Sequence, residues 1–212
     1  MPQPAPASTR ASEAGPDSVP SRHRIGILAL QGDFREHADA VRAIGAEPVL
    51  VRLPRDLVGV DALILPGGES TTMRKLVDRY GLCEPIAALA RGGAPVFGTC
   101  AGMILLADRI TDGEEPVLRL LDIAVQRNAY GRQLDSFESD VEIPQLGAEP
   151  LHGIFIRAPL VTDAGPEVEV LARDESGRPL AVRQGKVLAT AFHPELTDDR
   201  RMHRLFLQLI EA

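Results

Sequence analysis

A cysteine between two glycines is the most reactive arrangement in the sequence. The segment Gly98-Thr99-Cys100-Ala101-Gly102 matches the nucleophile-elbow pattern, with cysteine in the place of serine. The backbone of such a turn is strained and neighbouring chain presses close, so the flanking Gly98 and Gly102 must lack bulk. The turn also sets Cys100 at a helix N-terminus, where partial positive charge favours the thiolate. The pattern predicts a nucleophile, while a small buried cysteine beside a tight turn remains the alternative.

A base and a carboxylate follow one another late in the chain. His193-Pro194-Glu195 comes directly after a predicted strand at residues 187–191, and the proline stiffens the spacing. A cysteine nucleophile needs an imidazole to move its proton, and that imidazole needs a fixed tautomer and orientation. Cys100, His193 and Glu195 therefore supply one candidate for each role.

The remaining histidines and the second cysteine offer no comparable arrangement. His23 lies beside the N-terminal segment, and His152 precedes a strand. His37 and His203 are predicted on polar parts of helices, so a solvated or structural role is expected for all four. Cys83 has neither an elbow nor a partner in sequence, and we interpret it as structural.

A glycine turn at residues 65–72, Leu-Pro-Gly-Gly-Glu-Ser-Thr-Thr, stands between a predicted strand and a predicted helix. Backbone N–H groups exposed there suit an oxyanion hole. Phosphate binding is the rival interpretation, but the segment lacks both the ending of a P-loop and the spacing of a dinucleotide fingerprint. No His, Cys, Asp and Glu cluster has metal-ligand spacing, so we predict neither a metal nor a cofactor.

These candidates require an α/β scaffold. Short apolar runs alternate with helical patterns in the first half, which predicts a parallel sheet covered on both faces, with sites at the carboxyl ends of its strands. Asp33 and Glu36 form a capping-box pattern at the start of the first helix, and Gly45 suits its end. The predicted strands are residues 25–30, 47–53, 62–65 and 95–99, and further helices begin near residue 70 and span 101–107.

The second half is richer in strands separated by turn residues. A closing amphipathic helix is predicted at about residues 199–210, with Met202, Leu205, Phe206, Leu209 and Ile210 on one face. The predicted strands are residues 118–125, 136–143, 153–156, 168–172, 180–183 and 187–191.

Composition narrows the class of protein. With 212 residues, 44% hydrophobic and 25% charged, one domain at residues 23–212 is expected, preceded by a disordered Pro-, Ala- and Ser-rich tail at residues 1–22. A net charge of -7 argues against a nucleic-acid partner. No apolar run approaches a membrane span and no secretion signal is apparent, so we expect no membrane association and a cytoplasmic location.

The sequence resembles the class I, or triad, glutamine amidotransferases, and among them the glutaminase subunits of pyridoxal phosphate synthases. The resemblance spans residue 24 to the C-terminus. The elbow and His-Pro-Glu are shared by many amidotransferases, whereas Gly-Gly-Glu-Ser-Thr-Thr and Arg-Asn-Ala-Tyr-Gly-Arg-Gln are more particular to this subunit. The segments that carry the resemblance are 30–32, 63–73, 98–102, 127–133, 155–159 and 192–196.

The resemblance implies a flavodoxin-like α/β fold and a partner synthase built on a (β/α)8 barrel, in a hetero-oligomeric complex that uses L-glutamine. It makes Cys100 the nucleophile, His193 the general base and acid, and Glu195 the orienting carboxylate. N–H groups of Ala101 and of the Gly67-Gly68 turn would hold the oxyanion of an acyl transfer that proceeds through a thioester. The implied glutamine-binding residues are Gly68, Glu69, Ser70, Arg127, Ile156 and Arg157.

Two departures from the family pattern leave this chemistry untouched: the longer tail, and Gln126 where an acidic residue often stands. Three alternatives remain open at the level of sequence. They are an amidotransferase that serves another synthase, a cysteine hydrolase on the same type of sheet, and a catalytically silent binding module.

Overall fold

The structure, a computed structural model, describes residues 23–127 and 136–211. The predicted tail at residues 1–22 and most of the Arg-Asn-Ala-Tyr-Gly-Arg-Gln segment lie outside the described residues. None of the helices within the described ranges is long and apolar enough to cross a membrane.

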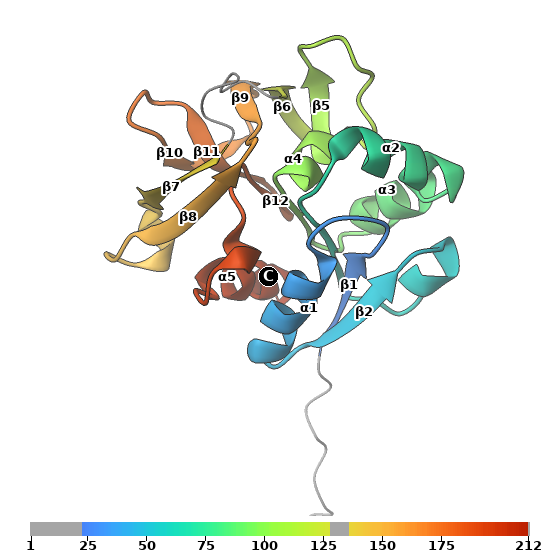
Figure 1. Cartoon of the computed structure of the whole chain (residues 1–212). Coiled ribbons are helices and arrows are strands. Elements are labelled where there is room, and N and C mark those ends of the chain that lie inside the picture. The colour runs from blue at the N-terminus through green and yellow to red at the C-terminus, as the bar shows by residue number, and fades with distance from the viewer. Residues whose placement is uncertain (1–22, 128–135, 212) are drawn as a thin grey trace, which may run out of the picture.

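A seven-stranded sheet forms the centre of the molecule, in the order β10-β11-β12-β4-β3-β1-β2 (Figure 1). The five strands from β2 to β12 pair in parallel, and β11 and β10 add antiparallel strands at one edge. Taking β12 as the fifth strand, the parallel part has the flavodoxin-like order 2-1-3-4-5. Its strands are β1 (Arg24–Leu28), β2 (Glu47–Val51), β3 (Ala62–Leu65), β4 (Val96–Thr99), β10 (Glu169–Arg173), β11 (Pro179–Gln184) and β12 (Val187–Thr190).

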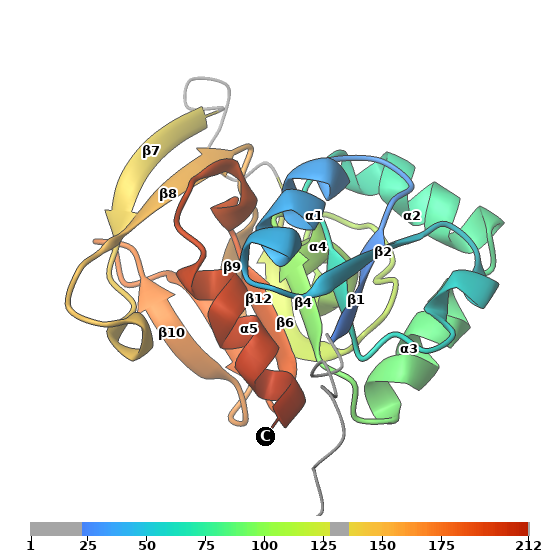
Figure 2. The same ribbon diagram turned by 90° about the horizontal axis from the view of Figure 1, so that it is seen from below.

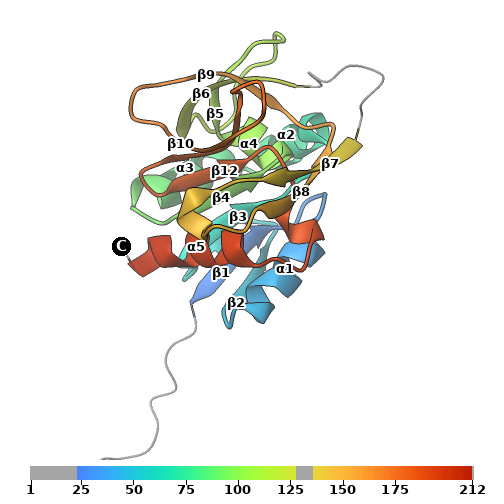
Figure 3. The same cartoon turned by 90° about the vertical axis from the view of Figure 1, so that its left-hand side faces the viewer.

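Helices cover both faces of this sheet, as predicted. In Figure 3, α1 and α5 lie below the sheet and α2, α3 and α4 lie above it. Successive residues of a strand point to opposite faces of the sheet, and two residues of β4 each meet a helix. The Phe97 ring packs on Phe206 of α5 with centroids 5.5 Å apart, whereas a Cβ on Gly98 would lie 2.6 Å from Gly102 of α4. The helices are α1 (Phe34–Ala43), α2 (Ser70–Arg79), α3 (Cys83–Arg91), α4 (Ala101–Leu106) and α5 (Arg201–Glu211).

Two smaller sheets complete the fold. A three-stranded sheet has the order β5-β6-β9, and β7 and β8 form an antiparallel pair. Their bounds are β5 (Ala107–Ile110), β6 (Leu121–Gln126), β7 (Ser136–Val141), β8 (Leu151–Ile156) and β9 (Leu160–Ala164), with short 3-10 helices at Pro54–Leu57, Pro144–Leu146 and Pro194–Leu196.

The capping box predicted for α1 is wrong. Asp33 is the N-cap residue, but its side chain makes no capping hydrogen bond, because its carboxylate is directed at His193 instead. Gly45 does end the helix as predicted, with φ 86° and its N–H bonded to the Arg42 carbonyl. Helix α3 and strands β5 and β9 were not predicted.

Candidate active site

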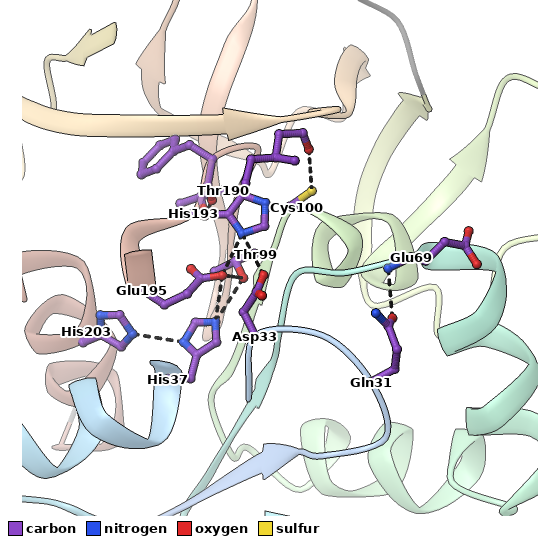
Figure 4. A network of polar contacts seen from close by, with 12 residues as sticks. Gln31, Asp33, His37, Glu69, Thr99, Cys100, Thr190, His193, Glu195 and His203 are labelled. Carbon is purple, nitrogen blue, oxygen red and sulfur yellow. Dashed lines mark hydrogen bonds and ion pairs between the residues drawn. The ribbon is translucent and has the colours of Figure 1, made fainter. Parts of the chain in front are cut away.

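Four neighbouring parallel strands bring their carboxyl ends to one place. Asp33 follows β1, Gly67 follows β3, Cys100 follows β4 and His193 follows β12. Open α/β sheets bind ligands at this edge. Figure 4 shows side chains from all four loops gathered there.

Cys100 lies on a strained turn, as the elbow pattern predicts. Its backbone has φ 48° and ψ -102°, and the residue is 4% exposed. A Cβ on Gly98 would lie 2.6 Å from the Gly102 carbonyl carbon, and a Cβ on Gly102 would lie 2.0 Å from the Leu65 carbonyl oxygen. Both glycines are therefore required by close backbone approach. The Cys100 thiol lies 3.6 Å from the Ile156 carbonyl oxygen, to which it donates.

The His193 ring stands beside the Cys100 thiol (Figure 4) and is almost fully buried. Its Nδ1 lies 2.8 Å from Glu195 Oε1 and 3.3 Å from Asp33 Oδ2. Nε2 has no hydrogen-bond partner within residues 23–127 and 136–211. Burial lowers the pKa of His193, but Asp33, Cys100 and Glu195 raise it by more, so the net pKa lies well above its usual range. The site therefore favours an imidazolium next to the thiol.

Glu195 is held in the interior by several donors. Its Oε1 accepts from Thr99 Oγ1 at 3.2 Å, lies 3.5 Å from His37 Nε2 and bonds His193 Nδ1. Burial would raise the pKa of this carboxyl, but the His37 and His193 rings outweigh it and lower the pKa below its usual range. Glu195 is thus an ionised carboxylate fixed against the histidine.

His37 and His203 do not lie on solvated helix faces, so of the two roles expected for them, solvated or structural, the solvated one is wrong. Each ring is fully buried, and His37 Nδ1 lies 3.0 Å from His203 Nε2. His37 Nε2 lies 3.1 Å from Thr99 Oγ1. The two rings meet between α1 and α5, which lie side by side on one face of the sheet (Figure 2).

A cavity of about 320 Å³ opens above Cys100 and His193. Its volume is at the lower end of the range for small-molecule sites. Eight of the predicted site residues line this cavity. Glu195 does not line it and lies behind His193. Gly67 and Ala101 are the sequence neighbours of the lining residues Gly68 and Cys100. The lining residues are Asp33, Gly68, Glu69, Ser70, Thr71, Cys100, Ile104, Arg127, Ile156, Arg157 and His193.

Glu69 has a local structural role in addition to its place in the cavity wall. Its carboxylate accepts from the backbone N–H groups of Thr71 at 2.9 Å and Thr72 at 2.7 Å, which caps α2. A hydrogen bond from the Thr72 side chain foremost, and then these two backbone bonds, lower the pKa of Glu69 to about 2. The Glu69 N–H donates to Gln31 Oε1 at 2.9 Å, so the loop after β1 positions the turn after β3.

Arg127 enters the cavity between two carboxylates. Its Nε donates to Asp112 at 2.9 Å, and its Nη1 lies 2.8 Å from Glu114 and 3.2 Å from Thr71 Oγ1. These partners fix the guanidinium plane while leaving further N–H groups for a ligand. Asp112 and Glu114 were not predicted as site residues, because nothing local in the sequence relates them to Arg127.

Asp33, His193 and Glu195 bring three potential metal-ligating atoms within 4.8 Å of one another. The raised pKa of His193 favours the imidazolium, and a protonated ring nitrogen cannot ligate a metal. A larger hollow of about 610 Å³ lies between β7, β8 and the β10-β11 turn, and its lining contains no cysteine or histidine. The cavity above Cys100 is therefore the candidate active site.

Comparison with known proteins agrees with this geometry. The model of the SNO glutamine amidotransferase family matches residues 27–212. A pyridoxal 5'-phosphate synthase subunit PdxT from Roseiflexus sp. (strain RS-1) is 57% identical over 187 residues, covering 87% of this chain and 99% of the relative. The PdxT of Acidothermus cellulolyticus is 55% identical over 203 residues, covering 92% of this chain and 98% of the relative.

Solved structures agree on the fold. A crystal structure described as a glutamine amidotransferase superimposes with a TM-score of 0.83 at 50% identity, covering 89% of this chain and 99% of that one. The PurLQS structure from Thermotoga maritima, at 18% identity, has a TM-score of 0.66 and covers 89% of this chain and 98% of that one. The predicted flavodoxin-like amidotransferase fold is confirmed, and the chain belongs to the SNO glutamine amidotransferase family.

Proposed function

We propose that this protein is the glutaminase subunit of a pyridoxal phosphate synthase, and that it hydrolyses L-glutamine and passes the ammonia to a synthase subunit. The observation that carries the proposal is the strained Cys100 beside His193 in the wall of one small cavity, with the buried Glu195 bonded to His193 behind it. The relatives named as subunits of that synthase support the choice of synthase.

Glutamine fits the charges of the cavity wall. A free amino acid carries a carboxylate and an ammonium, and the wall offers both the Arg127 guanidinium and the Glu69 carboxylate. In this pose the backbone of Gly68 and Ser70 and the segment Ile156–Arg157 would contact the substrate, which would place the side-chain amide over Cys100.

The reaction begins from the thiolate of Cys100 and the imidazolium of His193. The sulfur attacks the amide carbon, and the resulting oxyanion accepts hydrogen bonds from backbone N–H groups of Ala101 and the Gly67-Gly68 turn. The C–N bond breaks as His193 gives its proton to the leaving nitrogen, which releases ammonia and leaves a glutamyl thioester. Glu195 orients the imidazole throughout.

Water completes the cycle. It attacks the thioester carbon while neutral His193 accepts one of its protons, and the C–S bond then breaks to restore the thiolate and imidazolium. The products are ammonia and the acid form of the glutamate side chain, which loses its proton to solvent.

The ammonia has to reach its acceptor before it is protonated by bulk water, so a partner is part of the function. We infer that this partner is a (β/α)8-barrel synthase subunit that docks on the side of the molecule where the cavity opens. This part of the proposal rests on the family resemblance and on the names of the relatives.

The test is isotopic. The protein is mixed with the cognate synthase subunit and the other substrates of that subunit. Glutamine labelled with nitrogen-15 in its amide is supplied together with an excess of unlabelled ammonium salt. We expect labelled nitrogen in the pyridoxal phosphate despite the excess. Release of no glutamate at all would contradict the glutaminase assignment, and label diluted to the level of the bulk ammonium would contradict direct transfer.

A further inference from the structure

We propose that His37 is a positioning residue for the Glu195 carboxylate, and that His203 fixes the tautomer of His37. The inference rests on the proposed glutaminase function and extends its machinery to the opposite face of the sheet from α4.

A continuous chain of polar contacts connects α5 to the catalytic histidine (Figure 4). His203 Nε2 lies 3.0 Å from His37 Nδ1, and His37 Nε2 lies 3.1 Å from Thr99 Oγ1 and 3.5 Å from Glu195 Oε1. Thr99 Oγ1 donates to the same carboxylate oxygen at 3.2 Å, and that oxygen lies 2.8 Å from His193 Nδ1. The four elements α5, α1, β4 and the segment after β12 each contribute one or more members.

The partners determine where the protons lie. An ionised carboxylate only accepts, so Thr99 donates its single hydroxyl proton to Glu195 and must receive one from His37 Nε2. At the 3.0 Å contact between His37 Nδ1 and His203 Nε2, one nitrogen donates and the other accepts, so each ring constrains where the other carries its proton. Burial, followed by the influence of His37, lowers the pKa of His203 to about 3, which keeps that ring neutral. Every contact in the chain then has one donor and one acceptor.

This chain matters because Glu195 is charged and has no exposed side-chain surface. A buried charge without hydrogen bonds is costly and shifts toward the neutral form. Glu195 Oε2 has no hydrogen-bond partner in the described part of the chain, so the donors on Oε1 hold the group. Without His37, the Thr99 hydroxyl would lose its donor and Glu195 would lose its contact with His37 Nε2 at 3.5 Å.

The expected effect is on turnover and not on substrate binding, because His37 is absent from the cavity wall. We expect His37→Leu to lower kcat for glutamine hydrolysis by about 10- to 10²-fold with KM nearly unchanged, the range for loss of a buried hydrogen bond to a charged group. If His37 only packed against the Phe97 ring through their edge contact, its loss would not lower kcat selectively while leaving KM unchanged.

Two polar variants separate the two ring nitrogens. In His37→Gln the amide N–H2 takes the place of Nε2 and keeps the donor toward Thr99 and Glu195, so kcat should stay within about threefold of the wild type. In His37→Asn the amide takes the place of Nδ1 and keeps only the contact with His203, so kcat should fall as in His37→Leu. His23→Gln, a change at a half-buried histidine at the opposite end of β1, is the matched control and should leave kcat unchanged.

The closing experiment is a double-mutant cycle measured in the complex with the synthase subunit, with thermal unfolding recorded for each variant. In a Glu195→Ala background, His37→Leu should lower kcat by less than about twofold further, because its target is gone. A full His37→Leu loss in that background, or equal losses in the Gln and Asn variants, would overturn the inference. An active wild type with an unaffected His37→Leu variant would overturn the inference alone, whereas a wild type that releases no glutamate would overturn the proposed function with it.

Discussion

The backbone N–H of Asp33 donates a hydrogen bond to the carbonyl oxygen of Gly67 at 3.2 Å. This bond joins the loop after β1 to the turn after β3. Gly32 passes so close that a Cβ there would lie 1.8 Å from the same carbonyl oxygen. Because the C=O and N–H of one peptide point in opposite directions, the N–H of Gly68 is directed away from the Asp33 loop. The orientation of the Gly67-Gly68 peptide therefore depends on the Asp33 hydrogen bond to the Gly67 carbonyl and on the close approach of Gly32.

We predict that this turn couples glutamine hydrolysis to the presence of the synthase. Glycines exchange backbone conformations at small cost, and one misaligned oxyanion donor costs about 10²- to 10³-fold in rate. The free subunit should therefore hydrolyse glutamine more slowly than the synthase-bound protein. We expect the bound synthase to stabilise the orientation of the Gly67-Gly68 peptide in which its N–H serves as an oxyanion donor. Glutamate release by the two forms measures the activation ratio.

Gly68→Ala should reduce this activation ratio. Gly68 has φ 146°, and a Cβ there would lie 2.7 Å from Gln31 Oε1, so alanine restricts the turn. Gly81→Ala is the matched control, because Gly81 also has positive φ but no heavy atom within 4 Å of a new Cβ. Equal activity of the free and bound wild type would refute the coupling without affecting the catalytic assignment.

Asp33→Asn should shift the pH dependence of glutaminase activity. The carboxylate lies 3.3 Å from His193 Nδ1 and raises the pKa of that ring, so its neutralisation should lower the pKa. His193 must be protonated to release ammonia, hence the alkaline limb of the kcat profile should move to lower pH. The fall in kcat at neutral pH should be smaller than for Glu195, because the Asp33 side chain is 34% exposed and therefore screened. An unchanged profile would exclude Asp33 from the electrostatics of the site.

Glu195→Gln should preserve the fold and lower kcat by up to about 10⁴-fold, the loss expected when the carboxylate that orients a triad histidine becomes an amide. The amide loses the negative charge that stabilises the imidazolium and can hold the ring in the wrong tautomer. Steady-state hydrolysis and a circular dichroism melt of the same preparation provide the measurement. Turnover equal to that of the wild type would remove Glu195 from the triad.

Glu69→Gln should lower the free energy of unfolding by about 1 kcal/mol at pH 7, the usual size of a helix N-cap. The folded-state pKa of Glu69 is lowered from 4.5 to about 2, so the ionised cap stabilises the protein above pH 4.5. That contribution is lost as the pH falls through about 2. Urea denaturation at several pH values should show the difference between the two proteins shrinking below pH 4.5. A difference that stays constant down to pH 2 would mean that the charge of Glu69 does not stabilise α2.

Much of the fold and the triad could be predicted because their signals are local. The seven strands of the main sheet were predicted to within two residues at each end. Gly98 and Gly102 were predicted to lack a side chain because neighbouring backbone presses close, and in the structure a Cβ at either position would clash with backbone atoms. Cys100 and His193 end up together because both follow strands of one parallel sheet, which the alternating pattern already predicts.

The remaining parts depend on contacts that the local sequence does not encode. His37 meets His203 across 166 residues of chain, and either ring by itself fits a solvated helix face. Asp33 has an ordinary capping pattern and is drawn to His193 by tertiary structure. Helix α3 has Pro85 in its first turn, where the missing N–H costs nothing, but a proline between Gly81 and Gly92-Gly93 suggests a loop. The tail at residues 1–22 and the glutamine contacts stay predictions.

The most direct test of the account is Cys100→Ala, assayed in the complex with the synthase subunit with either glutamine or ammonium salt as nitrogen donor. Cys83→Ala is the control, since burial raises the pKa of the Cys83 thiol and that residue lies outside the cavity. We expect Cys100→Ala to lose glutamine-dependent synthesis by about 10³-fold or more while synthesis from ammonium continues, and Cys83→Ala to support both. Continued use of glutamine by the Cys100→Ala complex would contradict the assignment of the nucleophile and, with it, the proposed mechanism.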